Sequence, residues 1–260
     1  MELRDWAFKI LTSDLLEDKL DTPLELTDFS PGPPLYIKEP VRSQSLQFKK
    51  YQRKDRLPSI YSLSELDKRA ACLHRFAGHE LLAVEIMAHA LLAFPDAPKN
   101  FRRGLAHTLK EEQEHVRLYV KRLSEMGVSF GDLPLYKYFW SYVPHLDTPL
   151  KYVSMMSLTF EMANLDFAPY YGKAFASHGD DKSEALMKQI FKDELRHVSF
   201  GSKWFEKLKD PASAPWETWV SQLHPRLLPA RAKGPLFDPS SRRDAGISEE
   251  WITKLHESHL

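Results

Sequence analysis

Two short segments of the chain carry the residue types that could do chemistry. Residues 111–115 read Glu-Glu-Gln-Glu-His, and residues 193–197 read Asp-Glu-Leu-Arg-His. Residues three apart on a helix lie on one face, so the glutamate and the histidine of each Glu-x-x-His can bind the same metal ion. One such pair arises easily by chance in a chain rich in glutamate. The pattern is better evidence for a metal site because it occurs twice, each time directly after a further acid.

An upstream glutamate accompanies each pair at nearly the same separation. Glu80 precedes Glu112 by 32 residues, and Glu161 precedes Glu194 by 33. One glutamate from each of two helices, with Glu-x-x-His from each of two others, is the ligand set of a carboxylate-bridged dinuclear site in a four-helix bundle. The predicted metal ligands are Glu80, Glu112, His115, Glu161, Glu194 and His197.

Each of the two outer helices offers a second acid five positions later. Glu85 follows Glu80, and Asp166 follows Glu161. Five residues turn a helix by about 500°, so the two acids of a pair cannot face one site. We prefer Glu80 and Glu161, because the residue type is then the same in both helices. Glu85 and Asp166 stay open as alternatives.

Side chains next to the ligands are predicted to orient them. A ligating histidine usually donates its other ring N–H to a carboxylate. We therefore expect Asp193 to orient His115, and Glu111 to orient His197. The complete set predicted to surround the ligands is Glu111, Asp193, Arg196 and Tyr119.

The donor chemistry of this set indicates the metal. Carboxylates and imidazoles suit iron or manganese better than a thiophilic metal or a calcium ion in an all-oxygen cage. Four anionic ligands offset the charge of two divalent ions, whereas the same acids without metal would destabilise a core. We therefore expect two iron ions, with manganese as an alternative metal. A network of buried ion pairs is the structural alternative to metal binding.

Apolar periodicity predicts four long helices that would carry the ligands. The first is expected to begin at Ser62, where Ser62-Leu-Ser-Glu65 has the form of a capping box, and to end near Phe94. The others are expected over about 98–126, 149–177 and 182–209. The predicted fold is therefore all-α, a four-helix bundle.

Residues 128–147 are rich in aromatic side chains and are interrupted by glycine and proline. A bundle of this kind needs one long crossover between its two hairpins, and we expect this segment to provide it. Two short helical patterns follow the bundle, near 216–223 and 248–256. They predict a helical extension at the C-terminal end.

We expect residues 1–260 to form a single domain in three parts. Residues 1–61 would give a short helix over 5–20 and then an extended wrap, because recurrent prolines deny regular helix there. Residues 62–209 would form the bundle, and residues 210–260 the extension.

Composition excludes several classes of protein. Lysine plus arginine equals aspartate plus glutamate at 36 each, so no broad basic field favours nucleic acid or an anionic membrane. A nucleic-acid partner is thus disfavoured, although a local basic patch would permit one. Cys72 is the only cysteine, which excludes a disulfide framework and suits a reducing compartment. With no signal-like segment and no run of about 20 apolar residues, we expect a soluble, cytoplasmic protein.

These motifs resemble those of a known superfamily. Residues 193–197 resemble the Asp-Glu-x-Arg-His motif of oxygen-activating members of the ferritin-like di-iron carboxylate superfamily. More narrowly, residues 79–85, 94–103 and 231–235 are similar to a ferritin-like family described as a domain of unknown function, DUF455. The resemblance implies a ferritin-like bundle with two irons on the six predicted ligands.

Relatives in the superfamily include oxygenases, a tRNA-modifying hydroxylase, rubrerythrin-type peroxidases and ferritins. We expect a di-iron oxidoreductase that uses dioxygen to oxidise or hydroxylate a small organic substrate, with an external electron donor. The alternatives are a ferroxidase or peroxide scavenger, a tRNA-modifying hydroxylase, and a scaffold protein whose site is vestigial. The sequence leaves the substrate and the electron donor open, and also whether the chain forms a homodimer.

Overall fold

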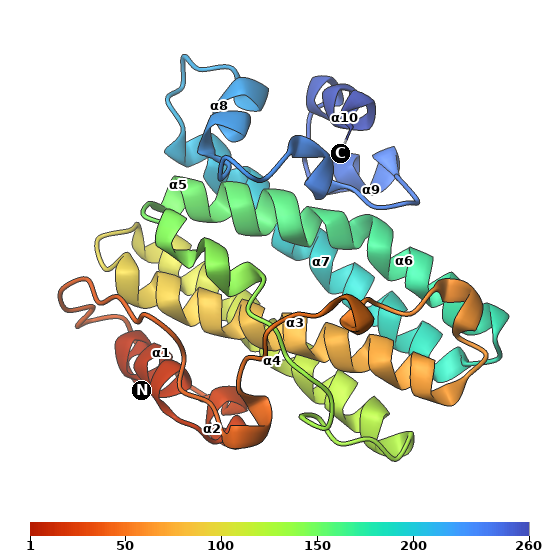
Figure 1. The fold of residues 1–260 in the computed structure, drawn as a ribbon. Helices are drawn as coiled ribbons and strands as arrows, with labels where there is room; N and C mark the ends of the chain where they lie inside the picture. The colour runs from red at the N-terminus through yellow and green to blue at the C-terminus, as the bar shows by residue number, and fades with distance from the viewer. Residues whose placement is uncertain (260) are drawn as a thin grey trace. The chain divides into compact units, whose positions relative to one another are not determined.

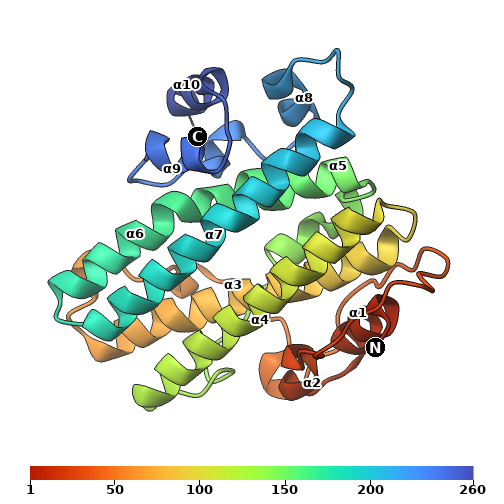
Figure 2. The same cartoon turned by 180° about the vertical axis from the view of Figure 1, so that it is seen from behind.

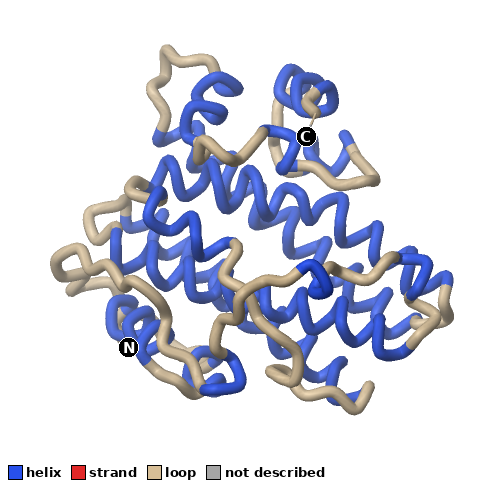
Figure 3. The backbone as a smooth tube through the Cα atoms, viewed as in Figure 1, coloured by secondary structure: helices blue, strands red, loops and turns tan. Residues whose placement is uncertain are grey.

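The computed structural model describes residues 1–259, and every regular element within that range is a helix (Figure 3). The chain divides into two compact units, Met1–Val143 and Pro144–Leu260. The prediction of an all-α fold is confirmed. The prediction of one domain stays a prediction, and the two units are described in turn.

The first unit is built on a hairpin of two long helices, α3 (Leu66–Ala93) and α4 (Lys99–Glu125), which lie antiparallel side by side in Figures 1 and 2. Pro95 and Pro98 stand in the connection between them. Proline cannot continue a helix but is compatible with the start of one, so α3 ends and α4 begins there. The helix predicted over 98–126 is confirmed to within one residue at each end.

The predicted start of α3 at Ser62 is wrong. Ser62 ends a short 3-10 helix, η3 (Ile60–Ser62), and its Oγ donates to the carbonyl oxygen of Ser59 at 2.7 Å. α3 begins at Leu66, and Glu65 before it makes no side-chain capping bond. The expected capping box does not form, because Ser62 belongs to the preceding 3-10 turn and the helix begins four residues later.

Arg102, buried near the start of α4, ties the hairpin connection to the N-terminal segment. Its Nη1 donates to the carbonyl oxygens of Leu91 and Phe94, at 2.7 and 2.9 Å. Its Nε and Nη2 donate to the two oxygens of the Asp28 carboxylate, both at 2.8 Å. The guanidinium therefore satisfies carbonyls at the end of α3 and holds the extended segment in place through a bidentate ion pair.

Two short helices, α1 (Leu3–Thr12) and α2 (Leu16–Leu20), precede the extended segment. The apolar face of α1 is buried, and α1 packs against α3. A single helix over 5–20 was expected, but the chain is extended at Ser13. The Ser13 Oγ donates to the Asp18 carboxylate at 2.7 Å, and such local side-chain bonds compete with helix continuation.

Helix α3 is the one helix among residues 1–259 that is long and apolar enough to cross a membrane. In its most apolar window, 83% of the residues are buried inside the protein. This degree of burial is typical of a helix in a protein core, which agrees with its place between α1 and α4.

The second unit is built on four consecutive helical segments: α5 (Pro149–Tyr152), the π-helix η5 (Val153–Glu161), α6 (Met162–Ser177) and α7 (Asp181–Leu208). Thr148 caps α5 by accepting a hydrogen bond from the backbone N–H of Lys151, and Pro149 occupies the first helical position. The predicted start of this helix is thus confirmed. α6 and α7 form the second hairpin (Figure 2).

The π-helix was not predicted, because its residues continue the apolar pattern of an ordinary helix. Its wider turn leaves the Ser154 carbonyl oxygen to accept from Thr159 Oγ1 at 2.8 Å and from Trp219 Nε1 at 3.0 Å. Such segments are rare and are frequently found at functional sites. This one ends on Glu161, a predicted metal ligand.

Gly201 of α7 lies directly against the π-helix. A Cβ atom built on Gly201 would lie 2.3 Å from the Ser157 Cβ, a distance that two carbon atoms cannot share. Glycine is therefore required here by the approach of two backbones, and not by an unusual φ angle.

Three further helices form the C-terminal extension: α8 (Pro215–Gln222), α9 (Pro239–Asp244) and α10 (Glu249–Glu257). Trp216, Trp219 and Trp251 pack together, and the Trp219 and Trp251 ring centroids lie 5.1 Å apart. α8 and α10 match the two predicted patterns, and α9 was missed because it is short and polar.

Candidate metal centre

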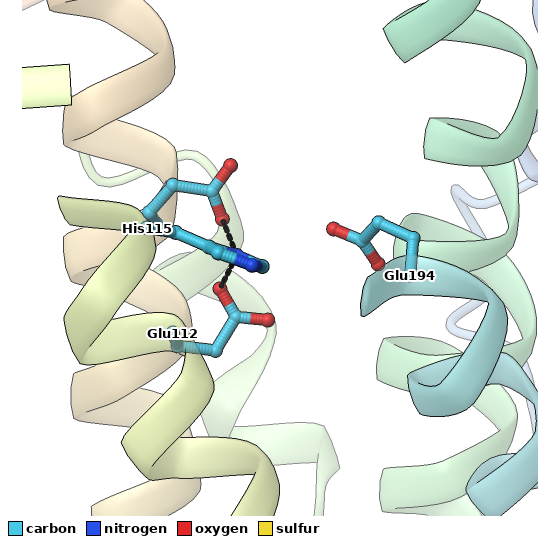
Figure 4. Close-up of side chains that lie close together, drawn as sticks. Glu112, His115 and Glu194 are labelled. Atoms are coloured by element: carbon cyan, nitrogen blue, oxygen red, sulfur yellow. Dashed lines mark hydrogen bonds and ion pairs between the residues drawn. The ribbon is translucent and has the colours of Figure 1, made fainter. Parts of the chain in front are cut away.

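The first unit brings together Glu80 from α3 with Glu112 and His115 from α4. Each side chain offers a donor atom, and the three donor atoms lie within 4.8 Å of one another. His115 Nδ1 lies 3.2 Å from Glu112 Oε2 and 4.0 Å from Glu80 Oε2, and Figure 4 shows the imidazole beside the Glu112 carboxylate. All three are buried, with at most 6% of their surface exposed. The cluster could hold a metal ion.

The second unit repeats the arrangement with Glu161 at the end of η5 and with Glu194 and His197 on α7. Donor atoms of Glu161 and His197 lie within 4.8 Å of each other. His197 Nδ1 lies 3.6 Å from Glu194 Oε2. These three side chains are also buried. Each unit thus supplies one glutamate and one Glu-x-x-His pair.

Asn164 holds one oxygen of Glu194. The Asn164 Nδ2 donates to Glu194 Oε1 at 3.0 Å, which leaves Glu194 Oε2 directed at His197. No lysine or arginine among the described residues pairs with Glu194. A buried carboxylate without a basic partner is costly, so a cation is expected beside it. Sequence reasoning missed Asn164, whose position one turn after Glu161 was the available signal.

The rival acid in the first unit, Glu85, is occupied by basic side chains. Arg42 Nε and Nη2 donate to its two oxygens at 3.1 and 2.5 Å, and Lys19 Nζ lies 3.1 Å away. All three side chains are buried. Burial lowers the pKa of Lys19, while the Glu85 carboxylate opposes that shift. Glu85 therefore anchors the N-terminal segment to α3.

The rival acid in the second unit, Asp166, is held in the same way by the C-terminal extension. Arg242 Nη1 and Nη2 from α9 donate to its two oxygens, both at 2.8 Å. The backbone N–H groups of Gly234 and Asp238 donate to it as well, at 2.8 and 3.0 Å. Four hydrogen bonds saturate the carboxylate, so it has little capacity left for a metal.

Asp193 was predicted to orient a histidine. Within its own unit it accepts from Gln189 Nε2 at 3.1 and 2.9 Å and from Arg196 Nη2 at 2.5 Å. Arg196 is thus a partner of Asp193, while most of its own side chain is exposed. The predicted pairing of Asp193 with His115 stays a prediction.

The remaining predicted neighbours lie on α4. His107 Nε2 lies 3.7 Å from Glu111 Oε1 on the outer part of the helix. Tyr119 is buried, and its ring meets that of Phe76 edge-on, with centroids 6.1 Å apart. The predicted pairing of Glu111 with His197 likewise stays a prediction.

Comparison with known proteins gives a family and no activity. A family model described as "Protein of unknown function (DUF455)" matches residues 7–253. An uncharacterised protein of Haemophilus influenzae is 22% identical over 200 residues, which cover 73% of this chain and 69% of the relative. No solved structure matches. The match extends over nearly all of the chain, including both donor sets and both terminal extensions, and the protein therefore belongs to the DUF455 family.

Proposed function

We propose that the protein is a non-haem di-iron oxidoreductase in which the donor sets of the two units jointly bind two iron ions. The observation that carries the proposal is the repeated set. Glu80, Glu112 and His115 gather their donor atoms within 4.8 Å, and the second unit offers the same residue types from equivalent helices. Together they match the ligand set of dinuclear carboxylate proteins.

The proposal includes the fold that such a site requires. The hairpins α3–α4 and α6–α7 would pair as a ferritin-like four-helix bundle, with the aromatic crossover between them. Three of the long helices have 27 or 28 residues, and the fourth rod is made of α5, η5 and α6 in succession. Rods of similar length are what a bundle of this kind needs.

The donor chemistry fits iron. All six side chains carry oxygen or nitrogen donors and are buried, and such donors suit iron or manganese. The single thiol, Cys72, is not a candidate ligand, because burial raises its pKa to about 12 and keeps it protonated. A buried free thiol also suits the reducing compartment in which we place the protein, the cytoplasm.

Iron bound here would supply one-electron redox chemistry and the capacity to react with dioxygen. The protein groups would bind and orient the ions. Asn164 fixes one oxygen of Glu194, so the other oxygen is directed toward the place of the metal. Burial of the ligands excludes bulk water and strengthens electrostatic interactions around them. The proposed reaction oxidises or hydroxylates a small organic substrate with electrons from an external donor.

Metal content tests the proposal. Protein from iron-supplemented cells should hold about two irons per chain, as expected for a dinuclear site. Glu112→Ala and Glu194→Ala should each lose tight binding of at least one iron. Glu114→Ala is the matched control, since Glu114 is an exposed acid on α4 and, among the described residues, pairs only with Arg117. Absence of iron from the native protein, or retention of two irons by both variants, would contradict the assignment.

A further inference from the structure

A second feature of the first unit, distinct from the metal ligands, is a cavity of about 410 Å³. It lies among the 3-10 helix η2 (Arg53–Asp55), η3, the first half of α3, and residues 133–136. Three cationic side chains, Arg56, Lys68 and Arg75, line it, together with two carboxylates, Asp55 and Asp67. The volume is in the range of small-molecule sites, about 300–1,000 Å³.

Arg75 is the central basic group of the cavity. Its Nη2 donates to the backbone oxygen of Asp55 at 2.8 Å, and its Cζ lies 4.4 Å from the Tyr136 ring centroid and 5.9 Å from that of Tyr51. Stacking and the single hydrogen bond fix the plane of the guanidinium and leave N–H groups to spare. The side chain is partly buried, and no described carboxylate forms an ion pair with it.

Two buried arginines of the first unit are paired with carboxylates. Arg42 and Arg102 are buried, and each binds a carboxylate through two nitrogens, Glu85 for the first and Asp28 for the second. Removing a guanidinium from water without an anionic partner is costly. Arg75 has no such partner among the described residues; Arg4, also partly buried, likewise donates to backbone oxygens, but Arg75 is the one that lines the cavity.

Two more cationic side chains reach the same cavity. Arg56 is exposed and has no ion-pair partner among the described side chains. The carboxylate that pairs with Lys68 belongs to its chain neighbour Asp67, at 3.3 Å; Lys68 is partly exposed and Asp67 largely exposed. Such an exposed pair is weak, so the Lys68 ammonium remains able to meet a ligand.

Tyr136 lines the cavity with an uncharged phenol whose oxygen atom is buried. Burial, together with the Asp55 carboxylate, raises the pKa of Tyr136 to about 12, so the phenol keeps its proton at neutral pH. The Asp55 carboxylate is itself engaged by the backbone N–H of Gln52 at 2.7 Å. His74 contributes no charge, because burial lowers its pKa to about 4.

We propose that this cavity binds a small organic anion, with its carboxylate or phosphate head on Arg75, Arg56 and Lys68. A guanidinium presents a planar fork that matches either head group. Leu57, Pro58, Leu133 and Pro134 provide the apolar surface for the body of the ligand. A charged head on an apolar body is the ligand shape that such a lining recognises.

Titration of the full chain with three probes tests the proposal, with binding followed by the backbone amide NMR signals of residues 55–58 and 133–136. The probes are phenyl phosphate, benzoate and inorganic phosphate. At least one organic anion should bind more tightly than inorganic phosphate, because only the organic probes use the apolar wall. The stronger of phenyl phosphate and benzoate identifies the preferred head group.

Variants then assign the contacts. Arg75→Gln should weaken binding of the preferred probe by about tenfold or more, as expected for loss of a hydrogen-bonded charge. Arg56→Ala changes an exposed side chain, so it keeps the test valid if Arg75→Gln fails to fold, and it should also weaken binding. Lys121→Ala, an exposed cation on α4, is the control and should bind like the native chain. Failure of all three probes at millimolar concentration, or native affinity in Arg56→Ala, would overturn the proposal.

Discussion

The two hairpins place equivalent acidic residues in the same way, but they differ in the regularity of the helix that carries the first acid. In the first unit Arg42, from the N-terminal segment, clamps the second acid of α3. In the second unit Arg242, from the C-terminal extension, clamps the second acid of α6. In both, the acid five residues earlier lies beside a histidine of the partner helix. In each hairpin, therefore, the first acid lies beside a histidine and the second acid is bound by an arginine.

The hairpins differ next to the ligands. Glu80 stands in an ordinary α-helix, whereas Glu161 ends a nine-residue π-helix. One turn after these glutamates stand Ala83 and Asn164, and only Asn164 can hold the following Glu-x-x-His glutamate. In the second hairpin the α-helix is thus interrupted at a predicted ligand. Departures of the structure from the local sequence pattern are commonly found at functional sites. If two metal ions bind as proposed, we expect their positions not to be equivalent.

The largest expected effect concerns the buried arginine that binds the second acid in each hairpin. Arg242→Ala leaves the buried Asp166 carboxylate without its basic partner and should cost about 3–5 kcal/mol of unfolding free energy. Arg42→Ala should cost less in the first unit, because Lys19 remains beside the Glu85 carboxylate. Urea denaturation measures both. Arg243→Ala is the control, because its exposed pair with Glu249 should contribute nothing measurable. A cost below about 1 kcal/mol for Arg242→Ala would show that the clamp is unimportant.

Acid should affect the first unit through His89. Burial lowers the pKa of His89 to about 4 from its ordinary 6.5, so the unfolded chain binds the proton more readily between those values. The contribution of neutral His89 to the free energy of unfolding is fully present above pH 6.5 and decreases as the pH is lowered. The loss reaches about 3 kcal/mol near pH 4. Denaturation at pH 7 and pH 4.5 measures the loss.

His89→Gln provides the comparison, because the substituted chain lacks this titration. Its unfolding free energy should depend less steeply on pH than that of the native chain. An unchanged slope would show that His89 does not titrate as its burial predicts.

The close contact between α7 and the π-helix gives the next effect. Gly201→Ala places a Cβ against Ser157 and should cost about 1–3 kcal/mol through overpacking. The double variant with Ser157→Gly should recover much of that loss, since the two side chains would no longer collide. Thermal or urea denaturation of both variants checks this. Additive losses in the double variant would mean that the contact is not the cause.

The smallest expected effect concerns metal affinity. Asn164→Ala removes the hydrogen bond to Glu194 and should weaken binding of one metal ion by about 10–100-fold, the range found for partners of ligands. Sequential titration of metal-free protein with Mn(II), followed by electron paramagnetic resonance, resolves the two binding events. Lys188→Ala, which changes an exposed side chain on α7, is the control and should leave both binding events at native affinity. Equal weakening of both ions would mean that the two positions are alike.

Local signals made much of the fold predictable. Pro95 and Pro98 mark the first hairpin connection, and Thr148 with Pro149 marks the start of the helical run α5–η5–α6, so these boundaries were found to within a few residues. The π-helix was not predictable, because Val153–Glu161 carries the same apolar residues as a normal helix. One of its carbonyl oxygens, that of Ser154, accepts from Trp219, which is far along the chain.

In the candidate site, too, local spacing was predictable and long-range contacts were not. Spacing placed Glu80 with Glu112 and His115, because helix periodicity fixes which side chains share a face. It could not show that Glu85 and Asp166 are clamped, since their arginines come from segments 43 and 76 residues away. Long-range ion pairs leave no local pattern in a sequence.

The most direct test is Mössbauer spectroscopy of protein loaded anaerobically with ⁵⁷Fe and then exposed to air. If the two donor sets bind a pair of ions, the oxidised sample will contain about two ferric ions per chain, coupled to each other and silent in electron paramagnetic resonance. Isolated, uncoupled ferric ions, or a chain that takes up no iron, would contradict a shared dinuclear centre.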